Sequence, residues 1–274
     1  MSRIVQLTDT HIVAPGRKAY GMVDTARALQ RTIKHINALP AVTDGIDAVI
    51  LTGDLTDHGT AEEYEHLLAL LQALVPPIHV VPGNHDTREA MRDALSATTS
   101  LPESGPLNWH VPFSDFDVIG LDSLVDGHAH GELTKDTLDW LGDRLDELAG
   151  RPMLLALHHP PFDTGILDMD RQKLKHPETL LEVARRSAGP VQIICGHVHR
   201  HIITMIDGFV AMIAPAPAHA VTFDQRPAEP ATLTFEPGAV LIHEWRQQDG
   251  AGHFLSHLSP FGPFDGPHPF DDGD

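Results

Sequence analysis

Three histidines stand two residues apart in the segment CGHVHRH, which spans residues 195–201. The segment follows the apolar run 191–194, which is typical of a buried strand. Side chains at positions i and i+2 point to the same side as the chain leaves a strand, so His197 and His199 face one site. Neutral imidazole is the commonest metal ligand in proteins. The pattern therefore indicates a metal site at a strand end.

Four more apolar runs end in side chains that bind metals. These side chains are Asp9 and His11, Asp54, Asn84 and His85, and His158 and His159. In an open α/β sheet the carboxyl ends of the strands form one ligand crevice, so we expect these residues to converge with His197 and His199. Gly53, Gly83 and Gly196 precede three of the groups, where they allow sharp turns and leave space for a ligand.

The chemistry of the set is specific. Carboxylate and amide oxygens mixed with imidazoles, without a thiolate, suit divalent ions such as Mn, Fe, Co or Zn. There are enough ligands for two ions that share one carboxylate. Two cations close together clamp a phosphoryl group and activate water for in-line displacement. The residues therefore predict a dinuclear site for phosphoester chemistry.

The apolar pattern predicts the elements that position these side chains. Strands are predicted over Arg3–Leu7, 48–51, Ile78–Val81, 118–121, 153–157 and 191–194. Helices are predicted after the N-capping residues Asp24, Thr60 and Thr134 and from Pro177, with Glu63 completing a capping box at Thr60. This alternation indicates an α/β layered domain. After residue 200 the pattern contains only strands, which indicates a second sheet packed on the first.

Composition limits the function classes. The chain has 274 residues and a net charge of 19 − 38 = −19, a field that repels nucleic-acid phosphates and anionic lipid. The single cysteine, Cys195, excludes an intramolecular disulfide and a cysteine-rich zinc site, and we expect it to be buried. No apolar run approaches the roughly 20 residues of a membrane-spanning helix. We expect a cytoplasmic protein whose partner is neither a membrane nor a nucleic-acid polymer.

The last segment differs from the rest in composition. We predict one domain over residues 1–245 and an arm over residues 246–274 that is rich in Gly, Pro and Phe. The arm either lies over the body or over another subunit, or it forms a disordered tail. Because aromatic residues are enriched at interfaces, the arm favours a homo-oligomer, a dimer or larger.

In order along the chain, the motifs D-x-H, G-D, G-N-H-D, a later H and G-H-x-H resemble those of the calcineurin-like metallophosphoesterases. The segments AYGMVDT, GDLTDHG, HGELTKDTLDWL, LALHHPPF and ILDMD make the resemblance closest to the bacterial class III cyclic-nucleotide phosphodiesterases and glycerophosphodiesterases. The likeness covers residues 3–225, and five spaced motifs in one order argue against a chance match. The resemblance implies a four-layer α/β/β/α sandwich with two mixed sheets flanked by helices.

The resemblance also implies a role for each ligand position. One ion is held by Asp9, His11, Asp54 and His199. The other is held by Asp54, Asn84, His158 and His197, so that Asp54 bridges the two. His85 lies beside the phosphate, where it steadies the charged oxygens or protonates the leaving alkoxide, and a metal-bridging hydroxide is the nucleophile. Asp54, Asn84 and His85 are thus the expected catalytic residues.

One departure from a related pattern bears on the substrate. Serine/threonine phosphatases of the same superfamily carry Arg in a GDxxDRG motif, whereas this chain reads GDLTDHG with His58 at that place. A missing guanidinium weakens binding of a dianionic monoester more than that of a diester, which has one charge fewer. Arg88 and Arg200 follow ligand motifs and are candidates to replace it. The sequence therefore favours small phosphodiesters, with 3′,5′-cyclic nucleotides such as cAMP preferred and glycerophosphodiesters as the alternative.

Two other function classes fit the sequence less well, and several residues near the ligand motifs have structural rather than metal-binding explanations. A non-catalytic scaffold would have lost ligands, and a nuclease would carry a basic stripe, whereas here every ligand position is filled and no such stripe is present. His159 could exchange roles with His158, although strand alternation puts the two on opposite sides. Asp57 and Asp86 are expected to support ligands or to cap turns. We expect packing or surface roles for His79, His128, His130 and His201, with a reach toward the site as the alternative for His128 and His130.

Overall fold

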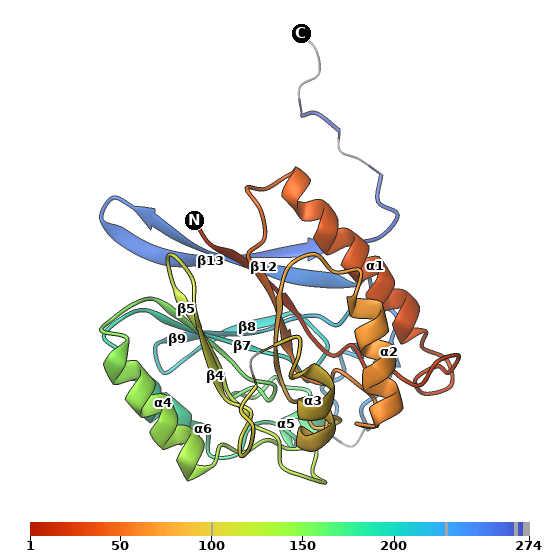
Figure 1. Cartoon of the computed structure of the whole chain (residues 1–274), viewed down its shortest axis with the longest axis horizontal. Coiled ribbons are helices and arrows are strands. Elements are labelled where there is room, and N and C mark those ends of the chain that lie inside the picture. The colour runs from red at the N-terminus through yellow and green to blue at the C-terminus, as the bar shows by residue number, and fades with distance from the viewer. Residues whose placement is uncertain (100, 228–229, 266–267, 271–274) are drawn as a thin grey trace.

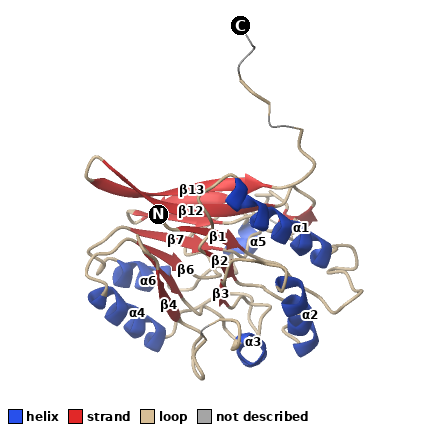
Figure 2. Ribbon diagram, turned by 45° about the horizontal axis from the view of Figure 1, so that its top comes forward, coloured by secondary structure: helices blue, strands red, loops and turns tan. Residues whose placement is uncertain are grey.

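The computed structural model describes residues 1–99, 101–227, 230–265 and 268–270. Two sheets pack face to face, and helices cover the outer face of each sheet (Figure 1). Figure 2 shows the same arrangement in a turned view, with helices on both sides of the strands. The predicted α/β/β/α architecture is confirmed. In this part of the chain, no helix is both long enough and apolar enough to cross a membrane.

Sheet one is a mixed five-stranded sheet. Its order is β13 (Ala251–Pro260), β12 (Ala239–Gln248), β1 (Arg3–Leu7), β2 (Ala48–Thr52) and β3 (Ile78–Val81). The first three strands of the chain run parallel, and β12 and β13 complete the sheet in antiparallel pairs. The carboxyl ends of β1, β2 and β3 therefore lie at one edge.

Sheet two is a mixed six-stranded sheet. Its order is β4 (Trp109–Pro112), β5 (Asp117–Gly120), β6 (Met153–Ala156), β7 (Val191–Cys195), β9 (Phe209–Ile213) and β8 (Ile202–Ile206). Strands β10 (Ala220–Val221) and β11 (Leu233–Thr234) form a separate pair. The prediction that the strands after residue 200 form the second sheet is wrong, because β8 and β9 extend sheet two whereas β12 and β13 extend sheet one.

The helices begin at the predicted caps. Sheet one is covered by α1 (Thr25–Ala38), the short 3₁₀ helix η1 (Leu39–Ala41), α2 (Ala61–Leu71) and α3 (Arg88–Leu95). Sheet two is covered by α4 (Lys135–Glu147), α5 (Leu167–Asp170) and α6 (Pro177–Ala184). Asp24 and Thr134 accept bonds from backbone N–H groups of the first turn, and Thr60 with Glu63 forms the predicted capping box. Helices α3 and α5 were not predicted.

Three apolar clusters hold the layers together. Val5 and Leu7 of β1 face the helices over sheet one, whereas Ile4 of the same strand faces sheet two. A third cluster lies between sheet two and its own helices, and it contains the buried Cys195, as predicted. The parallel strands are thus buried on both faces, as their continuous apolar runs indicate.

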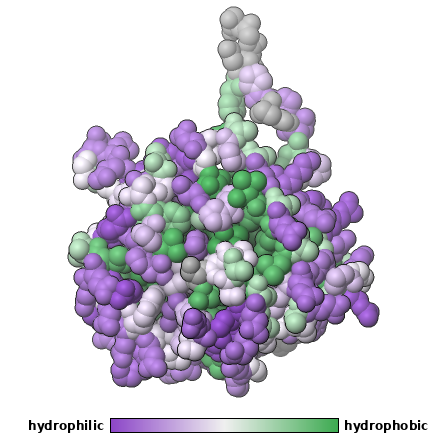
Figure 3. Space-filling view, viewed as in Figure 1, coloured by the Kyte–Doolittle hydropathy of each residue, from purple (hydrophilic) through white to green (hydrophobic). Residues whose placement is uncertain are grey.

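The C-terminal segment begins as regular structure. The predicted boundary at residue 245 falls inside β12, and β13 pairs with β12 over its whole length, from Ala251 to Pro260. Residues 266–267 and 271–274 of the predicted arm lie outside the described part of the chain. Polar residues cover most of the face seen in Figure 3, with apolar side chains at the surface in patches between them, and Phe264 after β13 is exposed. A homo-oligomer stays a prediction.

Candidate metal centre

The first group of ligand atoms joins the ends of three strands. Asp9 and His11 follow β1, Asp54 follows β2 and His199 follows β7. Nε2 of His199 lies 3.2 Å from Nε2 of His11 and 3.3 Å from Oδ1 of Asp9. Nε2 of His11 lies 3.5 Å from Oδ2 of Asp54. One ligand atom from each of the four residues falls within 4.8 Å of all the others.

The second group surrounds His158 at the end of β6. Its Nε2 lies 3.2 Å from Oδ1 of Asn84, 3.3 Å from Oδ2 of Asp54 and 3.3 Å from Nδ1 of His197. Asn84 follows β3 and His197 follows β7. Oδ2 of Asp54 therefore faces both groups.

These spacings fit metal ligands. Atoms that coordinate one transition ion at ~2.1 Å lie roughly 3–3.4 Å from one another. Six of the seven residues in the two groups are buried and Asn84 is half-buried. Buried polar side chains are usually paired, so a crowd of facing imidazoles and carboxylates calls for a cation between them. The described residues contain His and Asp side chains clustered as metal ligands.

Hydrogen bonds orient two of the imidazoles. Nδ1 of His11 lies 3.0 Å from Oδ1 of Asp57, and Nδ1 of His158 donates over 2.8 Å to the carbonyl oxygen of Thr52. Each ring therefore keeps a proton on Nδ1 and directs Nε2 at the ligand group. A carboxylate or carbonyl behind a metal-binding histidine is the usual arrangement in metalloproteins. The supporting role predicted for Asp57 agrees with this geometry.

The charges of the site favour a cation. Burial by itself raises the pKa of Asp9, but the neighbouring His199 outweighs it and lowers that pKa to about 2. Burial lowers the pKa of His158, but the Asp54 and Asp9 carboxylates and the bond to Thr52 together outweigh it and raise that pKa to about 9. The pKa of Asp54 itself lies well below its ordinary value, because burial is outweighed by His158 and other imidazoles. Both carboxylates are ionised and create a negative potential that a divalent ion satisfies.

Five of the predicted ligands have backbone conformations that side-chain-bearing residues rarely adopt. φ is 52° at Asp9, 42° at His11, 50° at Asp54, 76° at His197 and 55° at His199. Each such residue costs on the order of 1–3 kcal/mol and persists only where the surrounding structure holds it. The concentration of strained residues at these strand ends is typical of a functional site.

Glycines allow the two sheets to approach each other at the centre. Gly53 has a φ of 93°, and a Cβ atom there would lie 2.4 Å from Nδ1 of His158. A Cβ atom at Gly196 would lie 2.1 Å from Oγ1 of Thr8 and 2.9 Å from Oδ2 of Asp9. The space that the sequence predicted beside these glycines is filled by side chains of the opposite sheet.

His85 stands at the open side of the second group. Its backbone N–H donates over 2.9 Å to Oδ1 of Asp54, and its Nδ1 donates over 2.8 Å to the carbonyl oxygen of Asp57. Burial lowers its pKa, but the charges of Asp54 and Asp57 outweigh that effect and the pKa is raised. His85 therefore presents Nε2 away from its support, and its raised pKa favours the protonated ring.

His219 is a member of the site that the sequence reasoning missed. Its ring is buried and lies 4.6 Å from the ring of His199 and 6.0 Å from that of His11. Tyr20 lies 5.5 Å from His219 on the same side. His219 lies among Pro and Ala residues, and no other potential metal ligand stands close to it in the sequence. Only the large number of histidines in the chain could have indicated that one more of them belongs to the site.

The remaining predicted residues are placed as follows. Nδ1 of His159 lies 2.8 Å from Oγ of Ser123, although its ligand atoms also come within 4.8 Å of those of His158 and His197. His79 packs on Trp109 with ring centroids 5.3 Å apart, and His201 is exposed. Asp86 accepts bonds from the N–H groups of Leu55 and Gly83 and the hydroxyl of Tyr64, and His128 and His130 lie together in a loop.

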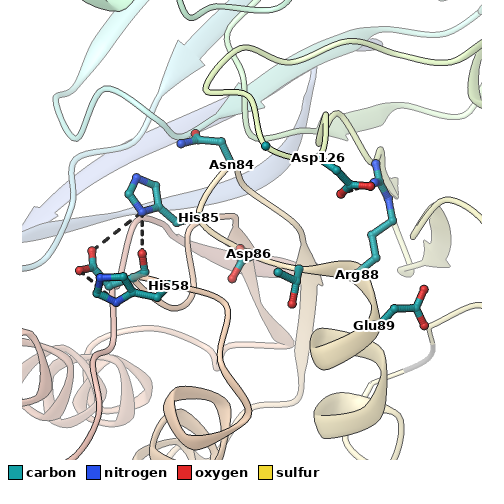
Figure 4. Close-up of a pocket in the computed structure, with 10 residues that line it drawn as sticks. His58, Asn84, His85, Asp86, Arg88, Glu89 and Asp126 are labelled. Carbon is teal, nitrogen blue, oxygen red and sulfur yellow. Dashed lines mark hydrogen bonds and ion pairs between the residues drawn. The ribbon is translucent and has the colours of Figure 1, made fainter.

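Two cavities meet at Asn84 and His85. The first, of about 590 Å³, opens over both ligand groups and has an apolar wall that includes Met22, Met169 and Leu233. The second, of about 540 Å³, is lined by charged residues that include His58, Arg88, Glu89 and Asp126. Figure 4 shows Asn84 and His85 on one side of this second cavity and the Arg88–Asp126 pair on the other.

Comparisons with known proteins agree with this geometry. Residues 2–201 match the calcineurin-like phosphoesterase family. The chain is 36% identical over 268 residues to a probable glycerophosphodiester phosphodiesterase of Arcobacter nitrofigilis, covering 97% of this chain and 96% of the relative. It is 30% identical over 200 residues to a 3′,5′-cyclic adenosine monophosphate phosphodiesterase of Escherichia coli K12, covering 73% of this chain and 70% of the relative.

A solved structure is similar in fold. A dimetal phosphatase from Danio rerio superposes with a TM-score of 0.63, covering 94% of this chain and 99% of that chain. The two chains are 13% identical, so this likeness concerns the fold alone.

Proposed function

The chain belongs to the calcineurin-like phosphoesterase family, and from this premise we propose that it hydrolyses small phosphodiesters at a centre of two divalent metal ions. The family resemblance predicted from the motifs is confirmed by the match over residues 2–201. The observation that carries the proposal is Oδ2 of Asp54, which lies 3.5 Å from Nε2 of His11 and 3.3 Å from Nε2 of His158. One carboxylate oxygen faces both ligand groups, as a bridge between two ions requires.

We assign the residues as the sequence suggested. One ion would be held by Asp9, His11, Asp54 and His199, and the other by Asp54, Asn84, His158 and His197. Fe, Mn, Zn and Co all accept this mixture of imidazole and oxygen donors. When bound, such ions supply Lewis-acid charge and lower the pKa of a coordinated water. His85 acts on the substrate itself, by steadying the phosphate oxygens and protonating the leaving alkoxide from Nε2.

The arginines near the site support a diester as substrate. Nε of Arg88 donates over 2.6 Å to Asp122, and its guanidinium also pairs with Asp126. Arg200 donates over 2.9 Å to the carbonyl oxygen of Val221 and pairs with Glu236. Both guanidiniums are already held by carboxylates, so neither replaces the clamp that a dianionic monoester requires.

The two cavities also suit a diester. A phosphodiester carries an organic group on each side of its phosphate, and Asn84 and His85 line both cavities. The larger cavity has room and apolar wall for one group, and the charged cavity has room for a polar one. A monoester would fill only one of the two.

Two substrate classes have equal support. The relative from A. nitrofigilis is a probable glycerophosphodiester phosphodiesterase and matches nearly the whole chain, whereas the relative from E. coli hydrolyses cyclic AMP and matches a shorter part. The preference for cyclic nucleotides therefore gains no further support, and both classes stay candidates. A cytoplasmic location also stays a prediction.

An activity panel tests the proposal. The metal-reconstituted protein is given cyclic AMP, glycerophosphoethanolamine, bis(p-nitrophenyl) phosphate and p-nitrophenyl phosphate at equal concentrations. We expect faster turnover of diesters than of the monoester, and loss of all activity with a chelator. A strong preference for the monoester would contradict the proposed diesterase activity. Full activity after complete metal removal would contradict the proposed metal centre.

A further inference from the structure

Polar side chains interrupt the apolar layer between the two sheets. Strand alternation places Gln6 of β1 on the same face as Ile4, and His243 of β12 on the same face as Leu241 and Trp245. Gln6 and His243 are completely buried. Amides and imidazoles in such a layer destabilise the fold unless every polar atom is bonded.

Each of these groups is bonded in one continuous series. Gln192 of β7 donates over 3.0 Å to Oγ of Ser256 on β13, and that hydroxyl lies 2.8 Å from Nδ1 of His243. Nε2 of His243 donates over 3.1 Å to Oε1 of Gln6, because an amide oxygen only accepts. Burial lowers the pKa of His243 to about 3, so the ring is neutral and has one donor and one acceptor, as the series requires.

Gln6 ends the series with two bonds, one to sheet two and one to the neighbouring strand of sheet one. Its Nε2 donates over 2.8 Å to the carbonyl oxygen of Cys195 on β7 and over 3.0 Å to Oγ1 of Thr52 on β2. Cys195 lies two residues before His197, and Thr52 lies two residues before Asp54. A single amide therefore ties sheet one to sheet two directly beneath ligands from both.

We propose that Gln6 is a positioning residue that fixes the distance between the sheet-one and sheet-two ligands of the metal centre. The inference rests on the proposed function, since it concerns the same centre. Apolar packing between the sheets is non-directional and tolerates small shifts, whereas two hydrogen bonds from one amide fix both strand ends relative to β1. Metal ions require donor atoms within a few tenths of an ångström of their ideal positions.

The substitution Gln6→Met tests this role, because it keeps the length of the side chain and removes its hydrogen bonds. Gln192→Met is the matched control, since it makes the same change in the same layer but leaves both bonds of Gln6 in place. Each protein is stripped of metal and titrated with Mn²⁺ by calorimetry, and the electron paramagnetic resonance spectrum of the loaded protein reports the coupling between the two ions.

We expect Gln6→Met to lower Mn²⁺ affinity by ~10–100-fold, as losses of supporting groups around metal ligands do, and to weaken the spin coupling. Gln192→Met should lower the melting temperature by about as much as Gln6→Met does. Its Mn²⁺ affinity and spin coupling should equal those of the wild type. Equal Mn²⁺ affinity in wild type and Gln6→Met, or an equal loss in both variants, would overturn the positioning role alone.

A wild-type protein that binds no Mn²⁺ would instead overturn the proposed function, so the two failures are distinguishable. If Gln6→Met does not fold, Thr52→Val decides, because it removes one of the two bonds of Gln6 and leaves the backbone carbonyl that holds His158. We then expect a smaller loss of Mn²⁺ affinity, and an unchanged affinity would contradict the inference.

Discussion

The two sheets contribute different chemistry to one centre. The ends of β1, β2 and β3 in sheet one supply every oxygen donor of the proposed ligand set, together with one imidazole. The ends of β6 and β7 in sheet two supply imidazoles alone. The donors are Asp9, His11, Asp54 and Asn84 from sheet one, and His158, His197 and His199 from sheet two.

The negative charge of the site and the positions of its donor atoms therefore have different origins. Ionised Asp9 and Asp54 create the potential that attracts cations, and sheet one carries both. Bonds to sheet one hold two of the sheet-two ligands, since Nδ1 of His158 donates to Thr52 and the backbone N–H of His197 donates over 3.0 Å to Oδ2 of Asp9. The carboxylates of sheet one therefore make the site selective for cations. The contact between the sheets determines how the donor atoms are arranged.

The largest effect is expected for Asp54→Ala, which removes the oxygen shared by both groups. Loss of both ions should lower kcat/KM on the order of 10³–10⁴-fold, because the ions supply several kcal/mol of transition-state stabilisation. His197→Ala removes one sheet-two ligand and should leave about one ion per chain, since the other ligand group stays intact. Elemental analysis of dialysed protein checks both variants, and two retained ions in Asp54→Ala would refute the shared bridge.

A smaller effect is expected for Asp57→Asn, which weakens the support of a sheet-one imidazole. The carboxylate lies 3.0 Å from Nδ1 of His11 and fixes its tautomer. Replacing it should reduce metal affinity by ~10–100-fold, the range usual for such supports. Calorimetric titration with Mn²⁺ measures the change, and Asp126→Asn in the charged cavity is the control. An affinity equal to that of the wild type would mean that the ring is oriented by packing alone.

The smallest effect concerns the layer between the sheets. The pKa of His243 is lowered from 6.5 to about 3, so the folded protein keeps this ring neutral while the unfolded chain protonates it below pH 6.5. The stability that depends on the neutral ring is therefore present above pH 6.5 and is lost progressively as the pH falls toward 3. Between pH 7 and pH 5 this amounts to about 2 kcal/mol.

The variant His243→Gln does not titrate in this range. It should lose less unfolding free energy than the wild type between pH 7 and pH 5, by about that 2 kcal/mol, in urea denaturation at the two pH values. Other buried histidines contribute equally to both proteins, so the difference isolates His243. Parallel losses in the two proteins would show that the ring is protonated in the folded state.

The local features of this protein were determined by the sequence. The ligand pairs Asp9 with His11 and His197 with His199 were recognisable because they directly follow apolar runs, and the capping box of Thr60 with Glu63 depends on helix geometry. Both act over a few residues. Strand ends that carry aspartate, asparagine and histidine could therefore be identified, but not the division of these strands between two sheets.

Tertiary structure alone decided what lies between distant segments. His219 joins the site through contacts with His11 and Tyr20 near the start of the chain, and Gln6 joins the sheets through its bond to Cys195. No local pattern encodes contacts between residues so far apart in the sequence. The division of the last strands between the two sheets and the pairing of Arg88 and Arg200 with acidic partners have the same origin. Periodicity fixes the face on which a residue lies, whereas its neighbour across the layer depends on how the whole chain packs.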